Sequence, residues 1–472
     1  MSDSSAPHEP FTARAAALAA TLSILVGAPF VTRWPDDWDS VGFVLSAQKI
    51  DVLAGSPHPP GYPLYALLCR ALGSVFVAHS ALPSFALSLA SLVSVALVAA
   101  LIATQLPPTR GPATRALLAT LAWSSCAGLL RLSGAIRPDL LALAALCFAC
   151  FFAHRNRPWL VSLCVGIALS LRLSELPLVL IVGAVFACRT PHARSLRWVC
   201  ALVGALALAL GSHALLAAAT GPRAYVSALV AHAVGHNTVW GDTAWIANDF
   251  PSRFSAFLQG ITGFFAEQRG GALGLLLLGS VLCRALFGAP SFARMAGSVR
   301  VATAGLVTWS LWIFVMQPPR VERHLAPLAI AVAVATADGL ARTRKPWIFR
   351  AITTLLALTT VANWVALAPV RARPVAGMSA ARFAQQHDAM LIGGRSARFA
   401  AVLGVPFAHA TTLADAEQTL VRLHRLPPVV LITSEVQHRA QAHGTLTWAT
   451  TLCGPRSPRG DPSCLALYRW RP

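Results

Sequence analysis

The stretch ALPSFALSLASLVSVALVAALIATQ, residues 81–105, decides the fold class of this chain. It contains no charged residue, and it is longer than the roughly 20 apolar residues with which a helix crosses the hydrocarbon core of a bilayer. Further apolar runs follow along the chain, separated by short polar stretches. Lipid offers no partners to backbone hydrogen-bonding groups, so only helices or closed barrels cross it. Because these runs are continuous and do not alternate with polar residues, the sequence predicts a multi-spanning helical membrane protein.

The composition agrees with this prediction and argues against nucleic-acid binding. The 472 residues are 56% hydrophobic and 12% charged, which is about half the charged fraction of a soluble domain. The formal net charge is +20, but nearly all basic residues are Arg, and most lie at the ends of apolar runs. Membrane orientation and anionic lipid headgroups account for basic residues at such places.

Eleven membrane helices are expected in an all-α domain of residues 15–370, after a cytoplasmic N-terminus of residues 1–14. The run 15–32 is similar to a signal peptide, but it lacks a small-residue cleavage site and is interpreted as a retained helix. Two long connections, 33–80 and 220–270, each contain an amphipathic segment expected to lie along the membrane interface. The helices are expected near residues 15–32, 81–105, 114–131, 138–153, 159–172, 174–188, 198–219, 271–288, 301–317, 324–341 and 350–369.

The loops on the two faces of this domain differ in charge. One set of short connections holds Arg or Lys and no Asp or Glu, namely residues 106–115, 154–158, 189–197, 284–300 and 342–350. The positive-inside rule places these connections in the cytoplasm. Nearly all carboxylates of the membrane domain then fall on the outer face, where we expect the chemistry. An odd number of spans after a cytoplasmic N-terminus places the C-terminus on the outer side.

Residues 371–472 differ from the rest and predict a small α/β domain. Strands are expected at 389–393, 405–409, 428–433, 446–452 and 464–470, and helices at 396–403, 414–423 and 435–443. Cys453 and Cys464 flank the turn-rich loop CGPRSPRGDPSC between two of these strands. In an oxidising outer compartment they are predicted to form a disulfide, the alternative being two free thiols.

The densest acidic cluster of the chain is WPDDWDS, residues 34–40, at the outer end of the first helix. Its carboxylates belong to Asp36, Asp37 and Asp39. A carboxylate at this place can take a proton from a hydroxyl or bind a divalent cation. The simpler interpretation is a solvated loop at a helix end.

A stiff corner follows this cluster in the stretch SPHPPGYPLY, residues 56–65. Proline fixes its own φ and pushes the residue before it into extended geometry, and Gly61 permits a turn that a side chain would obstruct. The corner is therefore expected to be rigid and non-helical and to hold His58 in a defined direction. The sequence leaves open whether His58 touches substrate or only shapes the corner.

The combined stretch DSVGFVLSAQKIDVLAGSPHPPGYPLY, residues 39–65, resembles the first outer loop of GT-C glycosyltransferases. It is more closely similar to a bacterial branch with an Asp-Ser-x-x-Phe loop followed by HPPGYP, related to protein O-mannosyltransferase-like membrane proteins. The resemblance covers about residues 15–370. It implies transfer of a sugar from a polyprenyl-phosphate carrier, with Asp39 as catalytic base and Asp37 as the alternative.

Two further stretches support this resemblance, IRPD at residues 136–139 and VERHLAPL at residues 321–328. The first resembles an Arg-Pro-Asp segment and the second an Arg-Tyr-Leu-x-Pro-Leu segment of the superfamily, with His324 in the place of the usual Tyr. The candidate substrate-binding residues are His58, Tyr62, Arg137, Asp139, Arg172, Glu322, Arg323 and His324.

Arg172 belongs to the stretch SLRLSE, residues 170–175, between two apolar runs. Charged groups at such a depth are candidates for function. The Arg residues on the outer face can also meet the charge of the lipid phosphate that leaves in the reaction. A structural ion pair of Arg172 with Glu175, at helical spacing, is the alternative.

A divalent cation stays possible, with Asp36, His232 and His236 as weak candidate ligands. His232 and His236 are four positions apart, and no third ligand has a diagnostic spacing.

The resemblance therefore implies an inverting glycosyltransferase of the bacterial inner membrane that acts on the outer, periplasmic face. It is expected to use a polyprenyl-phosphate-linked hexose or pentose and a glycan, lipid or protein acceptor. A transporter or flippase is the main alternative, but it would place ionisable residues at mid-helix, where this chain has few. A catalytically inactive scaffold that binds through its outer domain is the second alternative.

Overall fold

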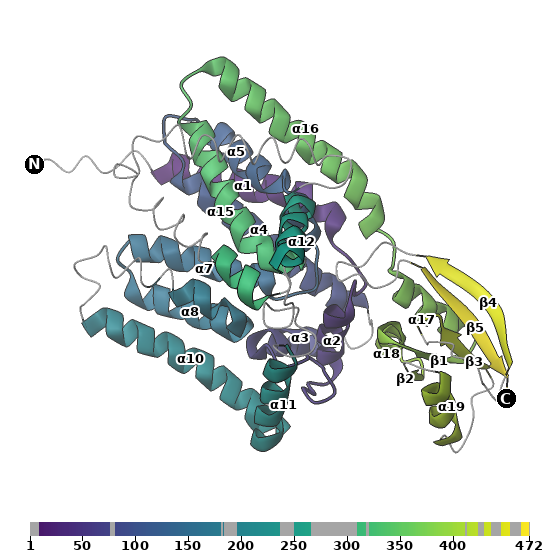
Figure 1. Ribbon diagram of the computed structural model, residues 1–472. Helices are drawn as coiled ribbons and strands as arrows, with labels where there is room; N and C mark the ends of the chain where they lie inside the picture. The colour runs from purple at the N-terminus through teal and green to yellow at the C-terminus, as the bar shows by residue number, and fades with distance from the viewer. Residues whose placement is uncertain are drawn as a thin grey trace, which may run out of the picture.

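The computed structural model describes residues 9–75, 81–180, 183, 196–236, 250–265, 309–317, 321–410, 413–422, 429–435, 445–453 and 464–471. A helical body is followed by a small α/β domain, which projects from it at the lower right of Figure 1. The body contains α1 (Glu9–Gly27), η1 (Ala28–Phe30), α2 (Trp38–Gln48), α3 (Pro63–Val75), α4 (Ala81–Gln105), α5 (Pro112–Ser124), α6 (Ala127–Ser133), α7 (Asp139–His154), α8 (Pro158–Leu171), η2 (Leu173–Glu175), α10 (Leu196–Thr220), α11 (Pro222–Gly235), α12 (Phe250–Phe265), α15 (Glu322–Ala341) and α16 (Pro346–Arg371).

Five helices of the described residues are long and apolar enough to cross a membrane: α1, α4, α10, α15 and α16. The helices α7 and α8 are apolar but shorter, with 16 and 14 residues. The expected helix at 271–288 lies outside the described residues, as do parts of 174–188 and 301–317. The total of eleven therefore stays a prediction, whereas the multi-spanning helical class is confirmed.

The prediction of a single helix at 114–131 was wrong, because α5 and α6 meet there at a bend of 93°. The bend frees backbone groups from the helical ladder, and α16 satisfies one of them, since the Asn363 side-chain amide donates to the Ser125 carbonyl at 2.9 Å. The Ser124 and Thr360 hydroxyls are also bonded, at 3.1 Å. These polar side chains of α16 explain why an apolar run without proline breaks at this point.

The acidic cluster was expected as a loop, but it begins the helix α2. Asp37 is the N-cap: its carboxylate accepts from the Ser40 backbone N–H at 2.8 Å, and the Ser40 hydroxyl accepts from the Asp37 N–H at 2.8 Å. This reciprocal capping box satisfies two backbone donors that a helix start leaves unpaired. It places Asp39 in the first turn of a buried helix.

The C-terminal domain has one five-stranded sheet in the order β2-β1-β3-β5-β4. The strand β1 pairs in parallel with β2 and β3, whereas β5 pairs antiparallel with β3 and β4. Its elements are α17 (Ala376–Gln386), β1 (Ala389–Gly393), η5 (Arg395–Arg398), α18 (Phe399–Val402), β2 (Phe407–His409), α19 (Leu413–Arg422), β3 (Val429–Thr433), β4 (Thr445–Cys453) and β5 (Cys464–Arg471). The α/β class of this domain is as predicted, although α17 was missed and most of the helix expected at 435–443 lies outside the described residues.

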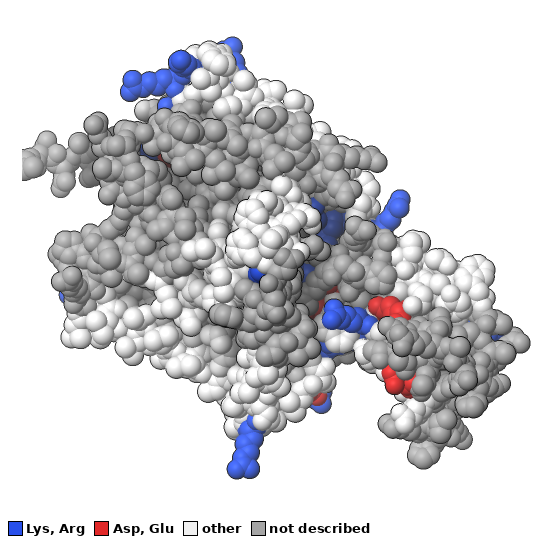
Figure 2. Space-filling model, in the orientation of Figure 1, with Lys and Arg blue, Asp and Glu red and all other residues white. Residues whose placement is uncertain are grey.

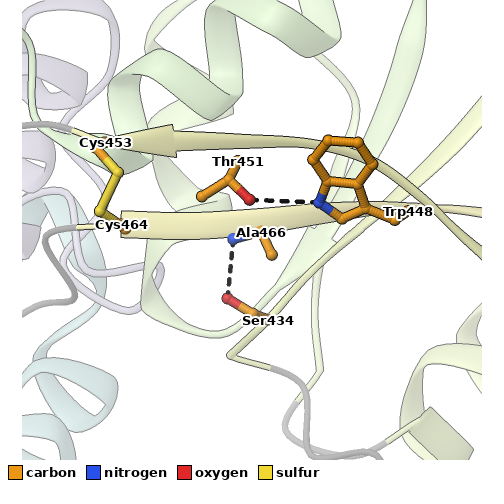
Figure 3. Close-up of a disulfide and its surroundings, with 6 residues drawn as sticks. All are labelled: Ser434, Trp448, Thr451, Cys453, Cys464 and Ala466. Carbon is orange, nitrogen blue, oxygen red and sulfur yellow. Dashed lines mark hydrogen bonds between the residues drawn. A yellow bond between two sulfur atoms is a disulfide. The ribbon is translucent and has the colours of Figure 1, made fainter.

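A disulfide joins the last residue of β4 to the first residue of β5 (Figure 3). Its two residues, Cys453 and Cys464, are also direct partners in the antiparallel register. The bond therefore closes the hairpin at the point where its strands separate.

The α/β domain packs against the connection between α1 and α4. One buried apolar cluster joins Val41 and Phe43 of α2 with Leu391 of β1 and with Phe399 and Val402 of α18. The two parts of the chain therefore share a core at this place, and the candidate site lies beside it.

Candidate active site

Each carboxylate of the acidic cluster is buried and paired with a different arginine. Figure 2 shows acidic and basic side chains gathered where the helical body meets the α/β domain. The pairs, which we call the α2 network, are Asp36 with Arg371, Asp37 with Arg137, and Asp39 with Arg323. The three arginines come from the end of α16, the loop before α7 and the start of α15, so the network joins distant parts of the chain.

Asp36 and Asp37 have mainly structural partners. Arg371 Nη1 donates to Asp36 Oδ2 at 2.6 Å. Burial alone would raise the pKa of Asp36, but the charges of Arg371 and Arg137 lower it below its usual value. Asp37 caps α2 through one oxygen and binds Arg137 through the other. Asp36 is therefore held ionised. Asp37 has both carboxylate oxygens bonded within the structure, which disfavours it as the base.

Asp39 has different surroundings, since it faces both a guanidinium and an imidazole. It is 1% exposed; Arg323 Nη1 donates to its Oδ2, and His58 Nδ1 lies 3.4 Å from its Oδ1. An imidazole changes its charge near neutral pH. Of the three clustered carboxylates, Asp39 is thus the one placed beside a group that exchanges protons.

The proline-rich corner holds His58 against Asp39. The turn before it is closed by backbone hydrogen bonds between Asp51 and Ser56, at 2.7 Å in both directions. Gly61 has φ +97°, a backbone conformation that favours glycine, and a Cβ there would lie 2.5 Å from the side chain of Leu216. The corner is non-helical, as its sequence predicts.

Two tyrosines support this corner. The hydroxyl of Tyr62 is 3.1 Å from His58 Nε2, and burial raises the pKa of this tyrosine. Tyr225 of α11 donates to the Pro60 carbonyl at 2.7 Å, and its hydroxyl is 2.7 Å from His213 Nδ1 of α10. His58 therefore has one ring nitrogen toward Tyr62 and the other toward Asp39.

A second buried network, which we call the α7 network, lies at the ends of α7 and α8. Arg172 pairs with Asp139 through its Nη1. The same nitrogen lies 3.1 Å from Glu175 Oε1. Its Nη2 is 3.2 Å from His324 Nδ1. The i,i+3 pair of Arg172 with Glu175 is thus present, but it is part of a larger group that includes Asp139 of α7 and His324 of α15.

The start of α15 connects the two networks. Arg323 binds Asp39 of the α2 network, whereas the next residue, His324, contacts Arg172 of the α7 network. The carbonyl of His324 accepts from the Trp309 indole at 2.8 Å, which fixes the first turn of the helix. The side chain of Glu322 lies outside the described residues.

The three weak metal candidates do not form one group. Asp36 pairs with Arg371, whereas the His232 ring lies 5.9 Å from the His58 ring and 6.4 Å from the His236 ring. Nε2 of His236 is 3.2 Å from the Met316 carbonyl, and burial lowers the pKa of this histidine. No group of three metal-ligating side chains occurs within the part of the chain that the structure describes.

Sequence reasoning missed Arg371 and Arg398. Arg371 carried a signal, because three clustered carboxylates in a buried place need counter-charges and the last helix ends on the same face. The sequence held no such signal for Arg398, which lies in the α/β domain in the stretch GGRSARF. Its guanidinium is nevertheless buried beside Trp38 and Gly55.

The arrangement suits proton abstraction from a hydroxyl next to an anionic leaving group. Asp39 supplies a buried carboxylate, and His58 lies beside it. Arg323 and Arg172 supply positive charge within the same buried region. Arginine guanidinium groups bind phosphate oxygens through parallel hydrogen bonds.

Comparisons with known proteins connect this geometry to a fold. No protein-family model matches the sequence, and no curated protein matches it. Among solved structures, the chain is similar to ArnT from Cupriavidus metallidurans bound to undecaprenyl phosphate, with a TM-score of 0.59 and 11% identity over 98% of each chain. The apo state of the same protein gives a TM-score of 0.57 at 11% identity, over 96% of this chain and 97% of that one.

An archaeal protein is also similar. The apo oligosaccharyltransferase from Archaeoglobus fulgidus has a TM-score of 0.50 and 11% identity, over 90% of this chain and 70% of that chain. Both neighbours have GT-C folds. The chain is therefore a multi-pass membrane protein with a GT-C-like helical body and a small α/β domain at its C-terminus.

Proposed function

We propose that the chain is a membrane glycosyltransferase that moves a sugar from a polyprenyl-phosphate carrier to an acceptor on the outer face of the bacterial inner membrane. The observation that carries the proposal is the position of Asp39, a buried carboxylate between His58 and Arg323 in a GT-C-like fold. The ArnT structure with undecaprenyl phosphate supports a polyprenyl-phosphate donor.

The proposed reaction is a single displacement at the anomeric carbon. Asp39 takes the proton of the acceptor hydroxyl while the oxygen of that hydroxyl forms the new glycosidic bond. The bond between the anomeric carbon and the phosphate oxygen breaks, and polyprenyl phosphate leaves with the electron pair. Attack opposite to the leaving group inverts the anomeric configuration.

Arginines at the start of α15 and the end of α8 are proposed to stabilise the leaving phosphate. Arg323 is partly buried and pairs with the candidate base Asp39, whereas Arg172 is buried and pairs with Asp139. Positively charged groups that are held in position stabilise developing negative charge strongly in a site that excludes water. Arg137 is the third candidate, and it pairs with Asp37, the N-cap of α2.

The proposal covers a hexose or a pentose as the donor sugar and a glycan, a lipid or a protein as the acceptor. The disulfide between Cys453 and Cys464 supports a periplasmic α/β domain, since such bonds persist in oxidising compartments.

The test is an assay with the purified full chain in lipid nanodiscs. A panel of radiolabelled polyprenyl-phosphate hexoses and pentoses is incubated with periplasmic and envelope extracts as acceptors, with and without EDTA, because a divalent cation stays possible. We expect release of polyprenyl phosphate and a labelled product whose anomeric configuration is inverted. In proteoliposomes, movement of the intact donor between leaflets without cleavage of its phosphate bond would contradict the proposal and support a flippase.

A further inference from the structure

Three arginines of the C-terminal segment contact the acidic cluster at every second residue. The guanidinium carbon of Arg382 lies 3.8 Å from the ring centre of Trp34, and that of Arg398 lies 4.3 Å from the ring centre of Trp38. Between these two tryptophans, Asp36 pairs with Arg371. We call Arg371, Arg382 and Arg398 the arginine clamp.

The backbone at Asp37 explains why its two neighbours lie on one side of the cluster. Asp37 has φ −158° and ψ 178°, which is extended backbone, and consecutive side chains of an extended segment point to opposite sides. Asp36 and Trp38 therefore face the C-terminal segment, and Trp34 contacts the same segment through Arg382. Asp37 faces the helical body, where it binds Arg137.

Arg398 makes the most extensive contacts of the clamp. Its Nη2 donates to the Ala54 carbonyl at 2.9 Å and to the Gly55 carbonyl at 2.6 Å. The residue is 7% exposed. A planar guanidinium can stack on a ring and donate to two carbonyls at once, and a lysine ammonium cannot reproduce this combination. Arg398 thus joins the first residue of α2 to the turn that precedes the proline-rich corner.

The turn is confined from both sides. Gly55 has φ +74°, and a Cβ there would lie 3.0 Å from both terminal nitrogens of Arg398. On the opposite side, a Cβ on Gly42 of α2 would lie 2.7 Å from the Gly55 carbonyl oxygen. The turn is therefore held between α2 and the guanidinium of Arg398, with no space on either side for a further carbon.

These contacts lie next to the two groups of the candidate active site. Trp38 directly precedes Asp39, and the turn ends two residues before His58. We propose that the C-terminal domain positions the active site, and that Arg398 is the positioning residue that sets the approach of His58 to Asp39. This inference rests on the proposed function, and it gives the α/β domain a role in the rate of the reaction.

The experiment compares Arg398→Met, Arg398→Lys and the matched control Arg395→Met in the full chain in nanodiscs. Methionine keeps volume in the buried position and removes the guanidinium. Arg395 lies three positions away in η5 with an exposed side chain. The readouts are kcat, the KM for the donor, the unfolding temperature, and hydrogen exchange of residues 50–62.

For Arg398→Met we expect kcat to fall by about 10- to 100-fold, because a displacement of about 1 Å in reacting groups has effects of this size. We expect the KM for the donor to stay within about twofold, since the substitution removes no contact with the donor. Residues 50–62 should exchange faster, and the unfolding temperature should stay close to that of the wild type. Arg398→Lys should recover part of kcat, and Arg395→Met should match the wild type.

Wild-type kcat and wild-type exchange in Arg398→Met would overturn the proposal. A fall in kcat together with a lower unfolding temperature and faster exchange throughout the α/β domain would also overturn it, because Arg398 would then act on domain stability. If the wild-type chain cleaves no polyprenyl-phosphate sugar, the proposed function fails. The exchange comparison still tests whether Arg398 orders the turn.

Discussion

The α2 and α7 networks meet at the start of α15, but they balance charge differently. In the α2 network, each of three carboxylates has its own arginine. In the α7 network, Asp139 and Glu175 share Arg172, and His324 is the fourth member. One network is thus a set of separate pairs, whereas the other depends on a single cation.

The difference predicts how each network responds to substitution. Breaking a buried pair leaves an uncompensated charge in a medium of low polarity, which is costly. Loss of one member of the α2 network affects one pair, but loss of Arg172 affects two carboxylates at once. The expected loss of unfolding free energy is therefore largest for Arg172→Met, smaller for Asp37→Asn and smallest for Glu175→Gln.

Arg172→Met should give the largest loss of stability. It leaves Asp139 and Glu175 buried without their shared guanidinium, and we expect the free energy of unfolding to fall by at least about 3–5 kcal/mol. Chemical denaturation in detergent measures this change. Arg342→Met is the control, because the Arg342–Asp338 pair is largely exposed and contributes about 1 kcal/mol or less. Equal stability of the two variants would contradict the shared-cation account.

Asp37→Asn should give an intermediate loss. Asparagine caps helices about as well as aspartate, so the capping box survives while Arg137 loses its charged partner. We expect a fall of about 3 kcal/mol, at the lower end for a broken buried pair. The double variant with Arg137→Met should recover part of this loss in a double-mutant cycle. Additive losses would show that Asp37 and Arg137 are not coupled.

Glu175→Gln should have the smallest effect. Glutamine is close in shape and neutral, and Arg172 then pairs with Asp139 alone. We expect the free energy of unfolding to change by no more than about 1 kcal/mol, because removal of a like charge from a buried pair of carboxylates offsets the lost ion pair. The same denaturation experiment measures it. A fall as large as that of Arg172→Met would mean that Glu175 is an equal partner in the network.

The sequence predicted the helical body better than it predicted the site. Uninterrupted apolar runs such as 81–105 marked α4, because a membrane span needs only length and low polarity. The break between α5 and α6 was missed because its cause, Asn363 bonded to the Ser125 carbonyl, lies far along the chain. The start of α2 had a local signal in Asp37-x-x-Ser40, which is a capping pattern, but the acidic composition suggested a loop.

For the site, the sequence singled out Asp39, His58 and Arg323, and the structure brings these three together. The partners of the other carboxylates could not be predicted in the same way. Arg371 is 335 positions from Asp36, and spacing carries no information about such a pair. Arg398 acts through its contacts with Trp38 and two backbone carbonyls, and such contacts leave no pattern in the sequence.

The rate of sugar transfer by Asp39→Asn and Asp37→Asn, each normalised to folded protein, tests the central claim most directly. Asparagine cannot accept a proton, and general-base catalysis contributes about 10²- to 10⁴-fold. We predict that folded Asp39→Asn loses transfer activity by this factor, whereas folded Asp37→Asn transfers sugar at a rate close to that of the wild type. Wild-type transfer by Asp39→Asn, or a selective loss in Asp37→Asn, would contradict the assignment of Asp39 as the base.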